Sequence, residues 1–463
     1  MNRGLFIYHR DFRIGDNRGL LNAAKKCDKL YTCFVFTPEQ VNRNSYKSKN
    51  TVEFMIESLS ELQSEIRSNG GDLIILYDTT VNALSLLIDE LKIDGLFFNE
   101  DYTPYAKKRT SDVEDLCNNK GIECETSQDY YIHKPGTIVN GSGNVYVRFT
   151  SFYESYFFKH EFDLPETTRV TNFSKTSKKF KTEISLQDAI ERFVGSTNPD
   201  LAVHGGRVLG LKMLLDASKR LKDYNETRDT MSEQTSMLSA YIKYGCVSIR
   251  EVVKRFRVKY SSHHEFIRQL IWRDFYMHLL SEHPYALGNI TNDKMRKAKW
   301  STNKDRLEKW KKGETGFPLV DAGMRQMNAT GYMHNRARMI VATFLSKILY
   351  LDWREGEKYF AQKLVDYDVA SNSGNWQAIV GGGLYSMPWF RILSPWAQSE
   401  KNDKNLEYIL KWVPELEDVE QKHVHKWYKY HKKYSAVKYP KPMVDFDKKR
   451  DDYMEKMKDI MSI

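Results

Sequence analysis

Residues 331–383 read GYMHNRARMIVATFLSKILYLDWREGEKYFAQKLVDYDVASNSGNWQAIVGGG, and this stretch decides the fold. Its apolar spacing predicts a pair of helices with a polar turn between them. Helical geometry then places Arg338 one turn after Asn335. Because a buried guanidinium is costly unless it is paired, we expect Arg338 to have a carboxylate partner, either Asp366 or Asp368. The stretch therefore predicts an apolar helical core that carries a polar site.

The composition indicates a globular protein with a polyanionic partner. A length of 463 residues suggests two or three domains, and 41% hydrophobic with 29% charged residues allows a sizeable core and excludes wholesale disorder. The net charge of +10 favours a partner such as a nucleic acid. From residue 421 onward, twelve Lys and Arg against six acids supply +6 of this charge. A solvated, lysine-rich helix is the alternative interpretation of that tail.

Cysteine usage and the N-terminus predict an intracellular location, cytoplasmic or nuclear, rather than secretion. The five cysteines form no CxxC pair, which is typical of reduced thiols, and no HExxH or cysteine cluster predicts a metal site. The first residues, MNRGLFIYHRDFRIGDN, carry charges where a signal peptide has an apolar run. Since no apolar stretch approaches 18 residues, we expect no membrane span.

The chain is predicted to comprise an α/β domain over residues 1–130, a linker over 131–200 and an all-helical domain over 201–463. In the first domain, apolar runs alternate with amphipathic segments, which predicts a doubly wound, parallel, five-stranded sheet. We expect the strands at residues 5–8, 30–36, 73–77, 95–99 and near 123, and the helices from about 17, 51, 81 and 105. No GxGxxG follows the first strand, so the dinucleotide fingerprint is missing.

Four motifs spread over almost the whole chain resemble the photolyase/cryptochrome family. They are HRDFRIGDN, TSMLSAYIKYGC, FIRQLIWRDFY and VDYDVASNSGNW. The resemblance is closest to class I DNA photolyases of cyclobutane pyrimidine dimers. It implies an antenna-type α/β domain and a helical catalytic domain that binds reduced FAD non-covalently and UV-damaged DNA. The implied reaction is light-driven electron transfer from photoexcited reduced FAD to a flipped-out lesion. We expect a monomer.

The resemblance also implies the residues that bind the cofactor. The segment from Thr235 to Ser239 matches the T-S-x-L-S in which hydroxyls and backbone N–H groups hold the flavin pyrophosphate. Taken alone, hydroxyls before a helix are more often an N-cap, and an isolated DYDVASN is more often an acidic helix start. The implied cofactor-binding residues are Tyr224, Thr235, Ser236, Met237, Leu238, Ser239, Phe266, Gln269, Arg273, Arg338, Asp366, Asp368 and Asn372.

The lesion side distinguishes branches of the family. The (6-4) enzymes require two histidines one helical turn apart, and this chain has Asn335 and Met339 there, the pattern of dimer photolyases. Asn372 would face flavin N5, where a neutral amide tolerates an anionic reduced flavin. The implied catalytic residues are Asn335, Met339, Trp272, Gln269 and Asn372. The implied DNA-binding residues are Arg228, Arg273, Trp272, Arg336 and Arg391.

Three tryptophans match the family's electron-transfer chain. Trp376, Trp353 and Trp300 are separated by 23 and 53 residues, and each lies in its own motif. The indole ring is easily oxidised, so the resemblance implies that these rings relay an electron from the surface to photoexcited flavin. Without the resemblance, helical aromatic residues such as Trp272 are more often core residues.

Two positions depart from the dimer-photolyase pattern and keep alternatives open. Gln269 stands where a glutamate is usual, and a glutamine cannot deliver a proton. Ala378 stands where a tryptophan usually stacks on the lesion, a contact that contributes about 1–3 kcal/mol. A cryptochrome-type photoreceptor without repair activity and a (6-4)- or DASH-like variant therefore stay in view. Residues 99–109 resemble the antenna cleft, which could hold a folate, a deazaflavin or nothing.

Overall fold

The structure is a computed structural model that describes residues 1–159 and 161–462. Residue 160 of the predicted linker and residue 463 of the predicted helical domain lie outside this description. The chain folds into two compact units. The first unit comprises Met1–Thr197, Val203–Lys222 and Ser236–Pro284, and the second comprises Asn198–Ala202, Asp223–Thr235 and Tyr285–Ile463. These units do not follow the three predicted segments one to one, so the domain boundaries at 130 and 200 stay predictions.

The first unit contains the predicted five-stranded sheet, in which all strands are parallel. The order is β3-β2-β1-β4-β5, and the strands are β1 (Arg3–Tyr8), β2 (Lys29–Phe36), β3 (Leu73–Tyr77), β4 (Gly95–Asn99) and β5 (Glu123–Ser127). Strands β1 to β4 are buried almost throughout, as apolar parallel strands covered on both faces should be. This confirms the predicted α/β class of the N-terminal part.

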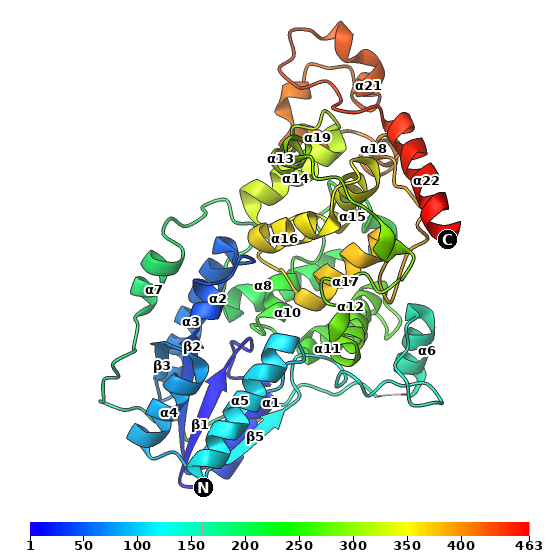
Figure 1. The fold of residues 1–463 in the computed structure, drawn as a ribbon. Coiled ribbons are helices and arrows are strands. Elements are labelled where there is room, and N and C mark those ends of the chain that lie inside the picture. The colour runs from blue at the N-terminus through cyan, green and yellow to red at the C-terminus, as the bar shows by residue number, and fades with distance from the viewer. Residues whose placement is uncertain (160, 463) are drawn as a thin grey trace. The chain divides into compact units, whose positions relative to one another are not determined.

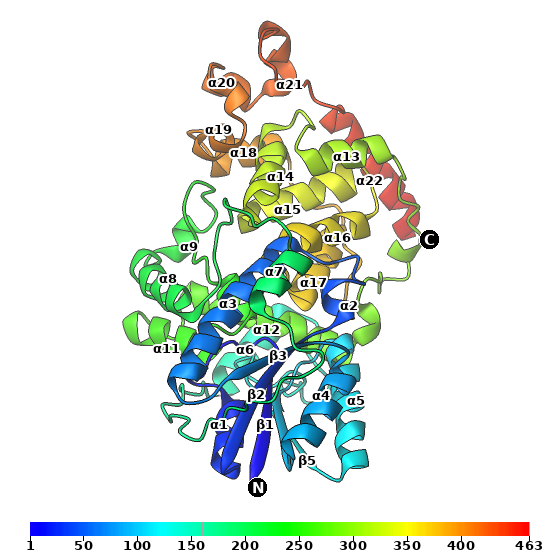
Figure 2. The ribbon, with the colours of Figure 1, turned by 90° about the vertical axis from the view of Figure 1, so that its left-hand side faces the viewer.

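Helices cover both faces of the sheet, as in a doubly wound fold. They are α1 (Arg18–Lys26), α2 (Pro38–Val41), α3 (Lys49–Ser68), α4 (Thr80–Leu91) and α5 (Pro104–Lys120). Figure 2 shows α4 and α5 on one side of the strands and α1 and α3 on the other. Side chains of α4 and α5 form one apolar cluster with Leu5, Ile7 and Cys33 of the strands. Each of the four predicted helices begins where the sequence indicated, within two residues.

Beyond the sheet and its covering helices, the first unit contains further helices joined by irregular segments. The predicted linker is therefore more structured than expected. Two helices lie within residues 131–200, because the aromatic and apolar residues there have helical spacing that the surrounding turn residues conceal. The two helices of the predicted linker are α6 (Phe149–Lys159) and α7 (Leu186–Phe193). The others are α8 (Arg207–Arg220), α10 (Ser239–Lys243), α11 (Ile249–Lys259) and α12 (Glu265–Glu282). Ser248 caps α11 in a capping box with Glu251, so this helix begins at Ile249.

Two fully buried arginines link distant segments of the first unit. Arg13 donates to Asp129 over 2.6 Å, and Arg250 donates to the other oxygen of Asp129 over 2.6 Å and to Asp16 over 3.1 Å. All four side chains are at most 2% exposed. Burial opposes ionisation of Asp129, but the two guanidiniums outweigh it and lower its pKa to about 2. The pairs join the loop after β1, the segment after β5 and α11.

The second unit is helical and has its own apolar core, as predicted for the later part of the chain (Figure 1). The stretch 331–383 forms three helices rather than a pair, because Asp352 and Asp368 each cap a new helix. A π-helical turn, Phe344–Ile348, extends α15. The helices are α9 (Tyr224–Thr227), α13 (Lys304–Lys312), α14 (Pro318–Thr330), α15 (Asn335–Thr343), α16 (Trp353–Lys363), α17 (Val369–Val380), α18 (Pro395–Asn402), α19 (Glu407–Trp412), α20 (Gln421–Val424), α21 (Trp427–Tyr430) and α22 (Phe446–Ser462).

Replacement of Asp129 by asparagine should destabilise the first unit strongly. The substitution leaves two buried guanidiniums with one carboxylate fewer, and the loss of one partner of a buried ion pair costs about 3–5 kcal/mol. We expect a correspondingly lower urea midpoint for Asp129→Asn, measured by circular dichroism. In the wild type the same stabilisation should disappear as the pH falls from about 4 towards 2, because only the unfolded chain then binds a proton at Asp129.

The control is Asp112→Asn, which breaks the exposed pair between Asp112 and Lys108 on α5. Surface pairs of this kind contribute about 0–1 kcal/mol. Equal midpoints for the two variants would show that the buried network does not stabilise the fold.

Candidate functional site

In the second unit, α15 begins at a buried histidine. The Nδ1 atom of His334 accepts a hydrogen bond from the backbone N–H of Arg336 over 3.1 Å and so caps the helix. Burial lowers the pKa of His334 to about 4, so the ring is neutral at pH 7 and its proton resides on Nε2. Within the described residues Nε2 is buried without a partner. The cap therefore offers one N–H donor to a bound molecule.

Arg338 pairs with Asp366, one of its two predicted partners. Its Nη2 atom lies 3.1 and 2.9 Å from the two carboxylate oxygens, and its Nε donates to the carbonyl of Met333 over 2.8 Å. The other candidate, Asp368, instead caps α17 by accepting from the N–H of Ser371 over 2.9 Å. The acidic helix start anticipated for DYDVASN is therefore present, and Arg338 is fixed by a different carboxylate.

Asn372 lies on the first turns of α17, and a buried glutamate orients its amide. The Nδ2 atom of Asn372 donates to the side-chain oxygen of Glu357 over 2.9 Å and to its backbone carbonyl over 3.2 Å. Glu357 is only 4% exposed and also accepts from the hydroxyl of Tyr367. With its N–H groups turned towards Glu357, Asn372 presents its carbonyl oxygen on the opposite side. Sequence analysis missed Glu357. It lies 15 residues before Asn372, and nothing in the sequence around it indicates a contact with that amide.

The three predicted electron-transfer tryptophans all belong to the core of the second unit. Trp376 and Trp353 are buried in it, at 2% and 1% exposure, and Trp300 is half-buried at its edge. The ring of Trp376 passes so close to Gly356 of α16 that a Cβ there would lie 2.2 Å from it. Trp300 packs on Tyr350, with ring centroids 5.1 Å apart. The buried-to-exposed order suits a relay, and the relay itself stays a prediction.

Sequence analysis also missed a buried lysine in the π-helical turn. The Nζ atom of Lys347 donates to the carbonyls of Trp389 over 3.0 Å and of Arg391 over 2.9 Å. Lys347 is 1% exposed, and burial followed by the nearby Arg391 charge lowers its pKa to about 7. The lysine thereby fixes a turn that exposes Phe390 and the predicted DNA-binding residue Arg391.

The predicted residues of α12 are positioned within the first unit. Gln269 donates to Glu265, one turn earlier, over 2.9 Å. The indole of Trp272 is half-buried, and Phe149 of α6 stacks on one of its faces at 3.5 Å and 8°. Arg273 donates to the carbonyl of Tyr130 over 2.8 Å. Phe266 is buried, and its cofactor contact stays a prediction.

The predicted phosphate cradle has strained backbone. Met237 adopts a left-handed φ of 54°, a conformation that costs a residue with a Cβ about 1 kcal/mol or more. The hydroxyl of Ser236 accepts from the N–H of Leu238 over 3.3 Å, and Ser239 begins the short helix α10. Such strain persists where the surroundings impose it, and it is common at ligand sites. The structure thus gives this motif a feature that a simple N-cap would lack.

Other predicted residues lie in the second unit beside acidic or hydroxyl partners. Thr235 shares a 2.8 Å hydrogen bond with the hydroxyl of Tyr332. Arg336 pairs with Asp229, and its Nε lies 3.2 Å from a carboxylate oxygen. Tyr224 begins α9 and Arg228 ends it. Asn335 is exposed and Met339 half-buried, one turn apart on the same face of α15. The predicted DNA-binding arginines are therefore accessible, but Arg336 already has a carboxylate partner.

Buried polar groups of His9, Tyr130 and Arg109 lie close together in the first unit, near the carboxyl end of β1. The Tyr8 and Tyr130 hydroxyls and two nitrogens of Arg109 are buried without a partner in the described chain. Burial followed by the Arg109 charge holds the pKa of His9 well below its usual value. The strand order reverses between β1 and β4, and in open α/β sheets ligands bind at such a switch point. Unsatisfied buried polar groups there indicate a site for water or a ligand.

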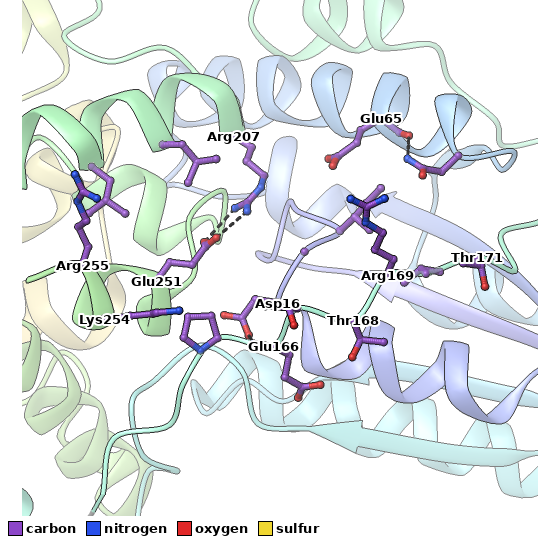
Figure 3. Close-up of a pocket in the computed structure, with 18 of the residues that line it drawn as sticks. Asp16, Glu65, Glu166, Thr168, Arg169, Thr171, Arg207, Glu251, Lys254 and Arg255 are labelled. Carbon is purple, nitrogen blue, oxygen red and sulfur yellow. Dashed lines mark hydrogen bonds and ion pairs between the residues drawn. The ribbon is translucent and has the colours of Figure 1, made fainter. Parts of the chain in front are cut away.

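The first unit also has a pocket of about 860 Å³ beside α8 and α11 (Figure 3). Charged residues of both signs line it, and Arg207 and Glu251 form an ion pair across part of it. None of the residues predicted for the cofactor or the lesion lines this pocket. We assign it no role. The described residues contain no group of His, Cys, Asp and Glu suited to a metal ion, and none of the described helices is both long and apolar enough to cross a membrane.

Comparison with known proteins identifies the family of both parts of the chain. Residues 5–169 match the DNA photolyase family, and residues 266–459 match the FAD binding domain of DNA photolyase. The deoxyribodipyrimidine photo-lyases of Halobacterium salinarum and Escherichia coli are 32% and 31% identical to this chain, each over 97% of both sequences.

Solved structures of the same fold include photolyases and a cryptochrome. A Sulfolobus tokodaii photolyase with two FAD molecules, described as implying a novel light-harvesting cofactor, has a TM-score of 0.88 at 36% identity and covers 99% of this chain and all of its own. A class III photolyase of Agrobacterium tumefaciens has a TM-score of 0.91 at 29% identity, covering 100% and 98%. A Synechocystis cryptochrome has a TM-score of 0.90 at 26% identity and covers 98% of this chain and 99% of its own. The predicted family and fold are thereby confirmed.

Lys347 should make the stability of the second unit depend on pH in a definite direction. Between about pH 7 and 10.5 the unfolded chain binds a proton at this lysine that the folded chain lacks, so stability should rise with pH there, by at most about 1.4 kcal/mol per unit. In Lys347→Met this rise should be lost. Tryptophan fluorescence during urea unfolding measures it, because eight of the nine tryptophans lie in the second unit.

The control for this measurement is Lys401→Met at an exposed position of α18, which should retain the wild-type dependence. If Lys347→Met keeps the same slope above pH 7, the pKa of the buried lysine is not depressed as the burial implies.

Proposed function

Because the chain belongs to the DNA photolyase family, we propose that it is a light-driven repair enzyme for cyclobutane pyrimidine dimers in DNA, acting inside the cell as a monomer. The observation that carries this proposal is the exposed face of α15, which presents Asn335 and Met339 one turn apart. A (6-4) enzyme would need two histidines there for proton transfer. The histidine that precedes the first turn, His334, is turned inwards as the cap and is neutral at pH 7.

FAD is the cofactor of the matched domain, and the residues of the second unit fit it chemically. When bound in its reduced form, FAD supplies an electron to the lesion after absorbing light and receives it back. Arg338, fixed by Asp366, would place a positive charge beside an anionic ring. Asn372, oriented by Glu357, would present a neutral amide rather than a carboxylate, and so would not repel that anion. The unpartnered Nε2–H of His334 is a further donor in the described chain.

Repair also requires the chain to hold a damaged duplex. The exposed Arg391, on the turn fixed by Lys347, and the half-buried Arg273 and Arg336 are proposed to contact the DNA backbone. Trp272 would offer the damaged bases the face that Phe149 leaves uncovered. Flipping a damaged step out of the stack costs a few kcal/mol and costs least where stacking is already poor, which favours the lesion over intact DNA.

A photoreceptor without repair activity is the second candidate, and one observation favours it. Ala378 is 3% exposed and lies where dimer photolyases usually have a lesion-stacking tryptophan, so this contact is missing. Its loss would reduce lesion affinity by roughly ten- to a hundredfold. Gln269 also replaces the usual glutamate. These departures weaken the lesion contact, but they do not remove the α15 face or the amide of Asn372, so repair is the better supported function.

We also propose that an antenna chromophore binds at the switch point between β1 and β4. The buried Tyr130 hydroxyl and the Arg109 guanidinium supply donors there that lack protein partners in the described chain. Tyr105 and Ala106 replace the polar pair of a folate site, and Tyr105 is 50% exposed. A tyrosine beside an arginine suits an aromatic chromophore with an anionic tail, and the missing polar pair counts against a folate.

Illumination of the purified protein with dimer-containing oligothymidine tests the repair function directly. With FAD reduced, absorbance in the thymine band should recover in light and not in the dark, because opening the cyclobutane ring restores the base chromophores. An oligonucleotide with a (6-4) product should show no recovery, since α15 lacks the histidine pair. The measurement is absorbance against time at fixed photon dose.

No recovery with either lesion would overturn the repair proposal and favour the photoreceptor. Recovery with the (6-4) product alone would contradict the assignment of Asn335 and Met339. Flavin content is measured on the same sample, so that a failure to bind FAD is separated from a failure to repair.

Arg109→Met should reduce the amount of antenna chromophore that co-purifies or reconstitutes. The variant removes the guanidinium of the buried cluster, two of whose nitrogens have no partner in the described chain. Chromophore released by denaturation is quantified by chromatography after incubation with FAD, a deazaflavin or a folate, and occupancy should fall several-fold. Lys108→Met, at an exposed neighbouring position, is the control and should retain occupancy. Full occupancy in Arg109→Met, or no second chromophore in any sample, would contradict the antenna site.

A further inference from the structure

Residues 421–444 form a strongly basic segment that the proposed lesion and cofactor sites do not use. This basic segment contains seven lysines, no arginine and no acidic residue, so it supplies most of the net charge of +10. For the tail from residue 421 onward, the sequence left two interpretations open, a polyanion-binding surface and a solvated, lysine-rich helix. A long lysine-containing helix is present only from Phe446 to Ser462, whereas the basic segment forms the short helices α20 and α21, a 3₁₀ turn at His431–Lys433 and an irregular stretch.

The basic segment is held in a fixed conformation by buried rings. Trp427 is 1% exposed, donates from Nε1 to the carbonyl of Pro440 over 2.9 Å, and packs on Tyr434 and Tyr439 with centroids 6.0 and 5.7 Å away. The buried His423 shares a 2.6 Å hydrogen bond with the hydroxyl of Tyr434. The aromatic residues therefore form a small core from which the lysines project outwards.

Most of the lysines of the segment lack a compensating charge. Lys422 pairs with Glu420 and Lys426 with Glu400. The five others are exposed, and no carboxylate of the described chain lies within 4.0 Å of them; they are Lys429, Lys432, Lys433, Lys438 and Lys441. Two of them lie over aromatic rings, with Lys429 5.5 Å from the Tyr428 centroid and Lys433 5.2 Å from the Tyr430 centroid. Uncompensated like charges on a fixed surface repel one another, and a polyanion relieves this repulsion.

The chemistry of the surface favours a nucleic acid over a membrane. A segment that binds a membrane surface needs an exposed apolar face. Within the described part of the basic segment, Tyr428 is the only large hydrophobic residue that is exposed, and its exposed fraction is 39%. Tyr428 rests on Trp396, with centroids 4.9 Å apart. Lysines that alternate with an exposed, supported ring are suited to a phosphate backbone and to stacking.

We propose that the basic segment is a second nucleic-acid contact surface, which binds the phosphate backbone of DNA without regard to sequence or damage. This inference rests on the proposed function, since it assumes that DNA is the polyanion brought to this chain. Figure 1 shows α21 at one end of the second unit, beyond α18 and α19, whereas α17 lies towards the other end. The surface is thus separate from the proposed lesion contacts on α15 and α17 and adds affinity for flanking or undamaged DNA.

The test is the salt dependence of binding to an undamaged duplex. The triple variant Lys429→Gln, Lys432→Gln, Lys433→Gln removes up to three phosphate contacts, so the slope of log K against log salt should become shallower by about 2–3. Affinity at low salt should fall by roughly tenfold or more. The full-length protein is used throughout, and repair per absorbed photon at saturating dimer substrate should stay unchanged. The control triple is Lys175→Gln, Lys179→Gln, Lys181→Gln, at exposed positions of the first unit.

Identical slopes for the two triple variants would overturn the proposal. So would a selective loss of binding to vesicles of anionic lipid, or to a polyglutamate peptide, with DNA binding intact. Thermal unfolding of both variants checks that the fold is preserved, and single replacement of Lys438 by Gln, outside the helices, provides a milder variant whose slope should change by about 0.9. If the protein fails to repair dimers but the slope still falls, the basic surface stands and the proposed repair function does not.

Discussion

The first unit depends on the pairing of Arg13 and Arg250 with Asp16 and Asp129. These side chains come from segments up to 234 residues apart, and each is almost fully buried. A charge in such a place is stable only when its partners are present, so the loop after β1, the end of the sheet and α11 must form together. This explains why α10, α11 and α12 belong to the same compact unit as the sheet. A helical pattern in the sequence cannot reveal to which unit a helix belongs.

The second unit uses the same device to fix its irregular segments. Arg338 is held by Asp366, Asn372 by Glu357 and the turn at residues 389–391 by Lys347. The Arg338 and Lys347 anchors each join a helix to an irregular segment, and the Asn372 anchor joins α17 to α16. Polar groups that are fully bonded inside a core specify one arrangement, because any alternative leaves a buried group unsatisfied. The proposed flavin contacts therefore lie on a scaffold whose polar side chains are already oriented before a ligand binds.

The strands of the sheet were predictable because they are short apolar runs between turn residues, and the bounds 73–77 and 95–99 coincide with β3 and β4. The sequence narrowed the partner of Arg338 to two carboxylates, Asp366 and Asp368, because a buried guanidinium needs a carboxylate partner. Glu357, Lys347 and Phe149 were not predictable. Each acts on a residue that is distant in the sequence, and a single glutamate, lysine or phenylalanine in an amphipathic helix has no distinguishing pattern. The conformation of residues 421–444 was not predictable for a related reason, because Trp427 contacts Tyr439 and donates to the carbonyl of Pro440, and neither contact has a pattern in the sequence.

The two departures from the dimer-photolyase pattern have different physical consequences. Gln269 directs its N–H group to Glu265, so its carbonyl oxygen remains to accept a hydrogen bond, for which thymine offers the N3–H group. A protonated glutamate at position 269 would donate a hydrogen bond from its hydroxyl group, and that bond is lost. The carbonyl oxygen of the glutamine still accepts one. At Ala378, the backbone oxygen accepts from the N–H of Met387 over 3.0 Å, and the residue is buried. Residue 378 therefore lies in a packed part of the second unit. In the proposed repair function the missing stacking ring lowers the affinity for the lesion, while the buried alanine leaves the packing of the fold intact.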